Sequence, residues 1–482
     1  MNANIRRLGV FFLVAFAIII VDLTYWQVFD AAGLQARADN PRLRYAAIHV
    51  RRGLIWDRNG TVLAGRSVDQ YGVVHRTYLD PSLSQVIGYS SQQYGNSELE
   101  ASYNDYLTGQ KVGTSWQAEI DQLEHKPVVG NNVTLTIDDR LQKEIANIMP
   151  DQPSSAMVAD PRTGEILGMV SKPSFDAGQI GNPSYWQALL NNPDEPLINR
   201  AVSGFYPPGS TFKVVTLSAA LDSGVYSLDS QFDGQQATGP LTVQGHVYPA
   251  TINNLGDCGG RVVSPPISLE EALVCSDNIV FAQVGLRLGS SRFIDYAQRF
   301  GLGSVPSFDI PVAESRIGPS GSSLDPVTLA SSAFGQGGLH VTPLQMLLSV
   351  EAIADEGRIP RPVLVRSVTA PDGSVVQNEQ TGTLGQPISS GAADLVKQAM
   401  TQVVGVGTGV LAQVPGVTMA GKTGTAETGD GKPPHAWFVC FAPINHPRVA
   451  VVVMVEHGGE GATVAAPLAK QIVQAALPLV PQ

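Results

Sequence analysis

The sequence predicts a multidomain α+β protein with three parts: an N-terminal membrane anchor, a mostly-β middle region, and a larger domain in which helices flank a central antiparallel sheet. Its 482 residues suggest two to four folding units at roughly 100–200 residues per domain. Apolar residues make up 43%, which is enough for a sizeable core. Strand patterns joined by tight turns occur in both folded regions, and such hairpins imply antiparallel pairing.

The anchor is predicted over residues 1–30. Arg6 and Arg7 precede a mostly apolar stretch that ends at Phe29. About 22 residues of helix rise roughly 33 Å, which is enough to span a bilayer. The arginines are expected on the cytoplasmic side, which places the rest of the chain outside the cytoplasm. A cleaved signal peptide, ending near the alanines at 31–32, is the alternative, and it also implies translocation.

Residues 31–152 are predicted to form a mixed, turn-rich and mostly-β domain. A hairpin is expected at 52–63, because an Asn-Gly pair between its apolar arms supplies a positive-φ turn. A strand at 133–137 is expected to run into a helix at 140–149. Pro153 then suggests a domain boundary.

Residues 153–482 are predicted to form the larger domain. Strand patterns flank a turn at 160–164 and occur again at 436–441 and 449–455. Helical patterns lie mainly between these strands, at 212–221, 268–288 and 343–354. An open sheet built from both ends of the segment, with helices inserted between them, is the most economical arrangement.

Composition excludes several classes of function. Lys and Arg number 31 against 42 Asp and Glu, and a net charge of −11 argues against a nucleic-acid partner, which would require a basic face. Three cysteines cannot build a four-thiolate metal site, and the eight histidines lack the close spacing of a zinc-binding helix. We therefore expect neither a metal nor another cofactor.

The first of three motifs in the larger domain pairs a candidate nucleophile with a candidate base. Ser210 and Lys213 are three residues apart at the start of a predicted helix, so their side chains share one face. A serine hydroxyl needs a base, and a buried lysine with a lowered pKa can act as one. Alone the pair is weak evidence, because a helix-capping serine followed by a surface lysine gives the same pattern.

Two further motifs follow, 66 and then 146 residues later. They are Ser276-Asp277-Asn278 and Lys422-Thr423-Gly424-Thr425. Alone the second means little, since Ser102 and Asn104 share its Ser-x-Asn form and are expected to be structural. The third predicts an exposed strand whose small residues let a ligand approach the backbone, although a glycine-rich turn would look the same.

In this order, the three motifs resemble those of the penicillin-binding proteins and serine β-lactamases. Other segments resemble class B penicillin-binding proteins, which are monofunctional peptidoglycan D,D-transpeptidases. These segments are 52–60, 196–201, 334–337, 342–346 and 436–438. The resemblance covers essentially the whole chain after the anchor. It implies an elongated, non-catalytic, dimerisation-like pedestal for 31–152 and a penicillin-binding transpeptidase domain of the serine β-lactamase type for 153–482.

The resemblance also implies acyl transfer on peptidoglycan stem peptides that end in D-Ala-D-Ala. Ser210 would attack the penultimate carbonyl, D-Ala would leave, and an amine of a neighbouring stem would take the acyl group. Lys213 is the leading candidate to accept the Ser210 proton. Ser276 could relay a proton between the lysines, and Asn278 could hold the substrate amide. The base of the second half-reaction stays open.

The third motif is implied to bind the substrate. Lys422 would supply positive charge, the hydroxyls of Thr423 and Thr425 would bind the terminal carboxylate, and Gly424 lies between them. The backbone N–H groups of Ser210 and Thr425 would form the oxyanion hole, in which each donor is worth about 3–4 kcal/mol.

Other functions of the same fold stay open. They are a D,D-carboxypeptidase, a β-lactamase, and a non-enzymatic division scaffold that binds β-lactams. The anchor and pedestal argue against a secreted hydrolase, and the three intact motifs argue against a scaffold. The resemblance further implies β-lactam inhibition, glycan derived from a lipid-linked precursor, and a membrane-embedded glycan polymerase as partner. It places the chain as a single-pass protein of the bacterial plasma membrane with an extracytoplasmic catalytic domain.

Cys258 and Cys275 are predicted to form a disulfide, because thiols outside the cytoplasm tend to be oxidised. The bridge would close a modest loop, worth about 3 kcal/mol in the chain-entropy model. It would also tether a glycine-rich segment to Ser276. The alternative is that Cys275 is a buried small hydrophobe, as Cys440 is expected to be.

Overall fold

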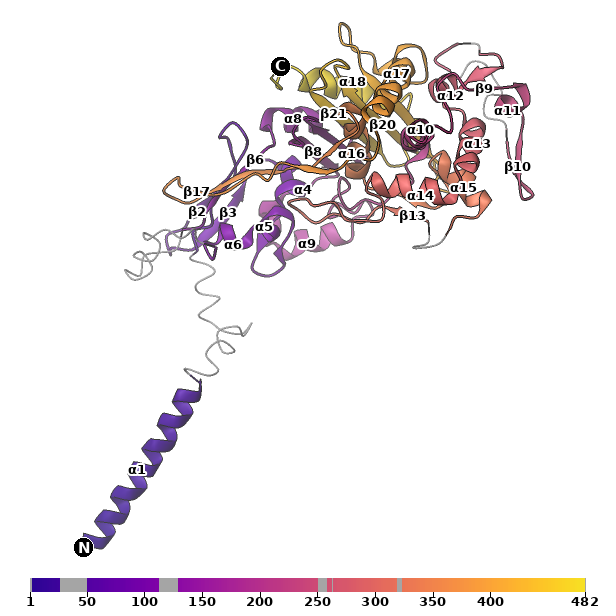
Figure 1. Cartoon of the computed structure of the whole chain (residues 1–482). Helices are drawn as coiled ribbons and strands as arrows, with labels where there is room; N and C mark the ends of the chain where they lie inside the picture. The colour runs from indigo at the N-terminus through magenta and orange to yellow at the C-terminus, as the bar shows by residue number, and fades with distance from the viewer. Residues whose placement is uncertain are drawn as a thin grey trace.

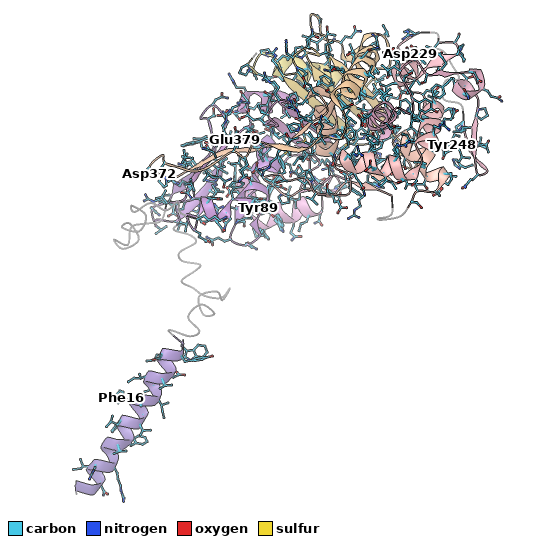
Figure 2. All side chains as sticks on the ribbon, viewed as in Figure 1. Phe16, Tyr89, Asp229, Tyr248, Asp372 and Glu379 are labelled. Carbon is cyan, nitrogen blue, oxygen red and sulfur yellow. A yellow bond between two sulfur atoms is a disulfide. The ribbon has the colours of Figure 1, made fainter. Side chains whose placement is uncertain are left out.

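The computed structural model describes residues 2–26, 50–111, 129–249, 258–261, 263–318 and 323–481 (Figure 1). Its first element is helix α1 (Asn2–Thr24). Within the described residues, α1 is the one helix long and apolar enough to cross a membrane, with a mean hydropathy of 2.2 over its best stretch. Its side chains are exposed, as Figure 2 shows for Phe16. The last residues of the predicted anchor lie outside the described part of the chain.

A six-stranded sheet forms the pedestal, in the order β17-β16-β6-β1-β2-β3. Its strands are β1 (Ile55–Trp56), β2 (Val62–Val68), β3 (Val74–Tyr78), β6 (Asn132–Leu135), β16 (Val365–Thr369) and β17 (Val375–Asn378). The hairpin predicted at 52–63 is present, with Gly60 at φ 85° in its turn. Strands β16 and β17 come from the larger C-terminal part of the chain and form a hairpin, in which β16 pairs with β6 and β17 lies at the edge of the sheet (Figure 1). The pedestal sheet therefore combines distant segments of the chain.

Short helices and two further strands complete the pedestal. They are α4 (Ser84–Ile87), β4 (Ser90–Ser91), β5 (Gly95–Asn96), α5 (Glu98–Ser102) and α6 (Asn104–Leu107). The carboxylate of Glu100 is fully buried and forms ion pairs with Arg52 and Arg76 at 2.5 and 2.6 Å. These pairs connect α5 to the start of the domain and to β3.

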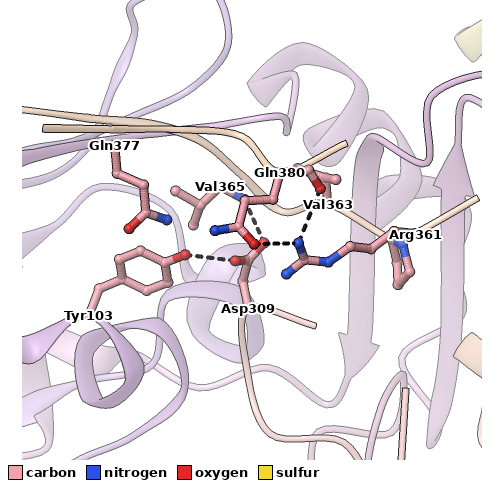
Figure 3. A pocket seen from close by; sticks show the side chains of 8 residues that line it. Tyr103, Asp309, Arg361, Val363, Val365, Gln377 and Gln380 are labelled. Atoms are coloured by element: carbon pink, nitrogen blue, oxygen red, sulfur yellow. Dashed lines mark hydrogen bonds between the residues drawn. The ribbon is translucent and has the colours of Figure 1, made fainter. Parts of the chain in front are cut away.

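A small cavity of about 110 Å³ lies where the β16–β17 arm meets the pedestal (Figure 3). Here the Asp309 carboxylate accepts a hydrogen bond of 2.6 Å from the Tyr103 hydroxyl and two more from the N–H groups of Leu364 and Val365. No residue of the three motifs lines this cavity. It belongs to the joint between the two parts of the molecule and not to the candidate active site.

The larger domain is built on a fully antiparallel five-stranded sheet, in the order β19-β20-β21-β7-β8. Its strands are β7 (Ser154–Ala159), β8 (Ile166–Lys172), β19 (Ala420–Ala426), β20 (His435–Ala442) and β21 (Val449–Val455). The sheet predicted from both ends of the segment is thereby confirmed. Because alternate residues point to opposite faces, Phe438 and Cys440 enter one core and Trp437 and Val439 the other. Cys440 is a free, buried thiol, as predicted.

Helices cover both faces of this sheet. On one face pack α18 (Ala465–Ala476) and α8 (Asp139–Ile148), which comes before the boundary expected at Pro153. On the other lie α10 (Lys213–Asp222), α16 (Pro343–Ala354) and α17 (Ser390–Val406). The remaining longer helices are α9 (Pro183–Leu190), α12 (Leu269–Val274), α13 (Asn278–Leu288), α14 (Ser290–Arg299) and α15 (Pro326–Ala333). The face of the sheet that packs against α10, α16 and α17 thus carries the helix that follows Ser210.

The continuous helix predicted at 268–288 is wrong. The chain forms α12 and α13 instead, and Ser276, between them, adopts φ 60°. Apolar residues continue at helical spacing through the break, so the pattern concealed it. The Asp277 side chain caps α13 by accepting hydrogen bonds from the N–H groups of Ile279 and Val280. Aspartate favours such a capping position over a helix interior, and this preference starts a new helix.

Candidate active site

Ser210 lies in the short 3-10 helix η4 (Gly209–Phe212), directly before α10. Gly209 adopts φ 55° and donates its N–H to the carbonyl of Gly335 at 3.0 Å. A side chain at Gly209 would meet the Thr425 carbonyl oxygen at 2.7 Å, so this position needs glycine for its conformation and for its close approach to β19. The nucleophile candidate is therefore held against the strand that carries the third motif.

Lys213 is the first residue of α10 and is 0% exposed. Its Nζ lies 3.0 Å from Ser210 Oγ. The same nitrogen lies 2.6 Å from the Ser276 carbonyl oxygen and 2.6 Å from Asn278 Oδ1. The structure thus brings the first two motifs into direct contact around a single amine.

The break between α12 and α13 places Ser276 between the two lysines. Its Oγ lies 3.2 Å from Lys213 Nζ and 2.9 Å from Lys422 Nζ. A left-handed backbone costs a non-glycine residue roughly 1–2 kcal/mol, and such residues concentrate at functional sites. The strained turn therefore gives one hydroxyl access to both amines.

Lys422 is also 0% exposed, and Thr423 is buried beside it, so the prediction of an exposed strand is wrong for these two residues. Lys422 Nζ contacts the Thr423 carbonyl oxygen at 3.0 Å and Thr423 Oγ1 at 3.2 Å. Thr425 is half-buried, and its hydroxyl oxygen accepts the Gly461 N–H at 3.3 Å. Small side chains made the strand look exposed, but η4 and the end of α17 cover it.

Burial sets the electrostatics of the site. It lowers the pKa of Lys213 well below its usual value, and the neighbouring Lys422 charge lowers it further, although Asp277 acts in the opposite direction. Burial alone lowers the pKa of Lys422 to about 7. Burial of Lys213 thus favours the neutral form of the amine beside Ser210, which is the form that can accept a proton.

Several residues were missed as site components by the reasoning from sequence. The hydroxyl oxygens of Thr408 and Thr423 lie 2.8 Å apart. The Gly335 carbonyl accepts the Gly209 N–H, and the Gly461 N–H donates to the Thr425 hydroxyl oxygen. A Gly-Thr-Gly triplet around Thr408 is the signal that could have revealed it. Ser210 and Thr425, whose N–H groups were predicted to form the oxyanion hole, lie on the adjacent segments η4 and β19.

Cys258 and Cys275 form a disulfide in the structure, with their Cα atoms 4.6 Å apart. The bond connects the residue before Ser276 to a tight turn closed by the Cys258–Arg261 pairing. Arg261 also forms an ion pair of 2.6 Å with Glu271 on α12. The turn that carries Ser276 is therefore joined to its surroundings both covalently and ionically.

Comparison with known proteins gives a family for both parts of the chain. Residues 154–474 match the model of the penicillin binding protein transpeptidase domain, and residues 52–133 match that of the penicillin binding protein A dimerisation domain. The chain is 34% identical to the peptidoglycan D,D-transpeptidase PbpA of Mycobacterium tuberculosis over 99% of both chains. It is 30% identical to the peptidoglycan D,D-transpeptidase MrdA of Escherichia coli over 78% of this chain and 63% of that one.

Solved structures agree with these relatives. The penicillin G acyl-enzyme of penicillin-binding protein A from M. tuberculosis superimposes with a TM-score of 0.80 at 33% identity, over 89% of this chain and 99% of that one. Pseudomonas aeruginosa PBP2 superimposes with a TM-score of 0.74 at 29% identity, over 89% of this chain and 96% of that one. The fold, including pedestal and central sheet, is shared across these proteins.

Proposed function

Because this chain belongs to the penicillin-binding protein transpeptidase family, we propose that it is a peptidoglycan D,D-transpeptidase that cross-links stem peptides through a serine acyl-enzyme and is inhibited by β-lactams. The observation that carries the proposal is the contact of 3.0 Å between Ser210 Oγ and the buried amine of Lys213. The pedestal, predicted at 31–152, and the catalytic domain, predicted at 153–482, are the two extracytoplasmic parts of this enzyme.

Hydrogen bonding at Lys213 supports its role as base. A neutral lysine has two N–H donors and one lone pair. The Ser276 carbonyl and Asn278 Oδ1, each 2.6 Å away, can only accept, so they take both donors. The lone pair is then left for a hydroxyl, and Ser210 Oγ at 3.0 Å is nearer than Ser276 Oγ at 3.2 Å, so Ser210 donates its proton to Nζ as Oγ attacks.

Acylation forms the bond from Ser210 Oγ to the penultimate D-Ala carbonyl carbon and breaks the amide bond to the terminal D-Ala. The negative charge that develops on the carbonyl oxygen is stabilised by the N–H groups of Ser210 and Thr425. The proton taken by Lys213 reaches the leaving amine through the Ser276 hydroxyl, which contacts both lysines. The acceptor amine then attacks the ester, forms the cross-link, and returns a proton to Ser210.

The third motif recognises the terminal carboxylate of the donor stem. Lys422 supplies positive charge when protonated, and its three N–H groups match three neutral oxygens, on Ser276 and Thr423. The hydroxyls of Thr423 and Thr425 donate to the carboxylate. Asn278 holds the substrate amide with the part of its side chain that does not bind Lys213.

Helix α1 anchors the enzyme in the bacterial plasma membrane with the catalytic domain outside the cytoplasm. An apolar helix of this length and a disulfide beside the active site both support this placement. A membrane-embedded glycan polymerase is the partner that supplies uncross-linked strands from lipid-linked precursors. The pedestal between anchor and catalytic domain supports such a docking role.

Labelling the full-length chain in detergent with a fluorescent penicillin tests the proposal. Mass spectrometry should find the adduct on Ser210, and Ser210→Ala should abolish labelling while the protein stays folded. A stem-peptide donor offered with and without an acceptor amine should give a cross-linked product that depends on the amine. Undiminished labelling of Ser210→Ala contradicts the mechanism, and release of D-Ala without cross-linking would indicate a carboxypeptidase.

A further inference from the structure

The turn that follows α17 connects the second and third motifs. Thr408 donates its backbone N–H to the Val274 carbonyl, at the end of α12, at a distance of 3.2 Å. Its side-chain oxygen lies 2.8 Å from Thr423 Oγ1. One residue therefore links the segment leading into Ser276 to the strand that carries Lys422.

The backbone holds this turn in a fixed position. A side chain at Gly407 would meet the Val274 carbonyl oxygen at 2.5 Å, so α12 and the turn pack backbone to backbone. On its other side lies Gly259, where a side chain would meet the Gly407 carbonyl oxygen at 2.5 Å. Gly259 belongs to the turn that the disulfide joins to Cys275. Close backbone packing on both sides therefore fixes the position of the turn that carries the Thr408 hydroxyl.

The hydrogen bonds available to Thr423 suggest a role for the Thr408 hydroxyl. A threonine hydroxyl has one donor and two lone pairs. Lys422 Nζ, 3.2 Å away, can only donate in its protonated form and takes one lone pair. If Thr408 donates to the other, both lone pairs are occupied and the Thr423 O–H is left as a donor for an anion.

We propose that Thr408 is a positioning residue: its hydroxyl donates to Thr423 Oγ1 and so directs the Thr423 O–H toward the terminal carboxylate of the donor peptide or of a β-lactam. The inference rests on the proposed function, because it concerns the same carboxylate subsite. A mainly structural Thr408 would support the fold but would not act through Thr423.

A double-mutant cycle on the full-length chain in detergent tests this, with the second-order rate constant for acylation by penicillin G as the measure. Thr408→Val removes the hydroxyl at nearly constant shape and should slow acylation about tenfold or more, because hydrogen bonds to charged groups are worth at least that factor. In a Thr423→Val background the same change should have less than about a twofold effect, since the group that Thr408 acts through is gone. Thr408→Ser should restore the wild-type rate.

Thr401→Val is the matched control, because the Thr401 hydroxyl caps a carbonyl within α17, away from the third motif, and its removal should leave the rate unchanged. If Thr408→Val does not fold, Thr408→Ala and Thr408→Ser complete the comparison. Equal losses from Thr408→Val in both backgrounds, or no loss in either, would overturn the proposal. Failure of the wild-type chain to be acylated would instead overturn the proposed function.

Discussion

Buried positive charge is handled in opposite ways in the pedestal and in the active site. In the pedestal, Arg52 and Arg76 surround the fully buried carboxylate of Glu100 at 2.5 and 2.6 Å. In the candidate active site, Lys213 and Lys422 are fully buried but contact neutral oxygens, and each amine touches the Ser276 hydroxyl. The two arrangements share a desolvation cost and differ in what offsets it.

The pKa shifts follow from that difference. Burial acts to raise the pKa of Glu100, but the charges and hydrogen bonds of Arg76 and Arg52 outweigh it and leave the pKa below its usual value. At Lys213, burial and the charge of Lys422 act in the same direction and lower the pKa far below its usual value. Matched charges therefore hold the pedestal together, whereas unmatched ones provide a lysine that can accept a proton.

The largest expected effect comes from removing the amine of Lys213, the proposed base. Lys213→Met should slow acylation by a fluorescent penicillin by about a thousandfold, within the range for losing a general base. It should not lower the unfolding temperature, because an apolar side chain of similar length replaces a desolvated amine. Stopped-flow labelling and thermal unfolding of the full-length chain measure both quantities. A variant that unfolds at lower temperature would show that Lys213 is structural.

The converse substitution in the pedestal should lower stability and spare chemistry. Glu100→Gln leaves two largely buried guanidinium groups with a weaker partner and should destabilise the chain by roughly 3–5 kcal/mol. The acylation rate of the folded protein should stay within about twofold of wild type. Denaturant unfolding and labelling at a temperature where the variant is folded test this.

Glu98→Gln is the matched control, because burial raises the pKa of Glu98 to about 7 and its charge is not held by the two arginines. This change should cost far less stability than Glu100→Gln. Equal costs for both substitutions would contradict the role assigned to the Arg52–Glu100–Arg76 pairs.

The sequence predicted the sheet of the larger domain better than the turn that completes the site. Strands β20 and β21 show as long apolar runs because both their faces are buried, and α16 matches its predicted bounds. The pairing of β16 with β6 could not be predicted, since it joins strands far apart in the chain. The break at Ser276 was hidden because helical spacing of apolar residues continues on both sides of it.

Residue types in the sequence predicted the candidate catalytic groups, but they did not predict how those groups are arranged. Three motifs indicated Ser210, Lys213, Ser276 and Lys422 as candidates, yet only the fold shows two amines meeting at one hydroxyl. Thr408 escaped notice because the Gly-Thr-Gly triplet around it is also typical of an ordinary turn. Its contact with Thr423 depends on how α17 ends, which no local pattern specifies.

Covalent attachment is the next difference between the two regions. The disulfide joins the turn that carries Ser276 to the turn that contains Cys258. In the pedestal, the ion pair between Arg52 and Glu100 joins two segments instead. Replacing Cys258 and Cys275 with serine should destabilise the chain by about 3 kcal/mol in the loop-entropy model. Acylation should slow by less than about tenfold, because the lysines keep their contacts.

Alkylation of the denatured, unreduced protein followed by intact mass measurement provides the baseline. One modified thiol, that of Cys440, is expected. Three modified thiols would contradict the bridge, and unchanged stability of the double variant would show that the bridge does not support the turn.

The smallest expected effect is a pH dependence of stability at Lys422. Its pKa is about 7 in the folded chain and about 10.4 when unfolded, so between these values the unfolded chain binds more protons and wild-type stability rises with pH. Lys422→Met lacks this titration and should be more stable than wild type at pH 6. That advantage should shrink by roughly 2–3 kcal/mol between pH 6 and pH 9.

Denaturant unfolding at several pH values measures that margin, and Lys143→Met provides the control. Lys143 is exposed and forms an ion pair with Asp139 at 2.6 Å, and this hydrogen-bonded partner raises the pKa of Lys143 above its usual value. Lys143 therefore stays protonated in both states up to pH 9, and the margin between Lys143→Met and wild type should be flat over this range. If the Lys422→Met margin were equally flat, Lys422 would stay charged in the folded chain. The two regions would then handle buried charge alike at that position, and only Lys213 would separate them.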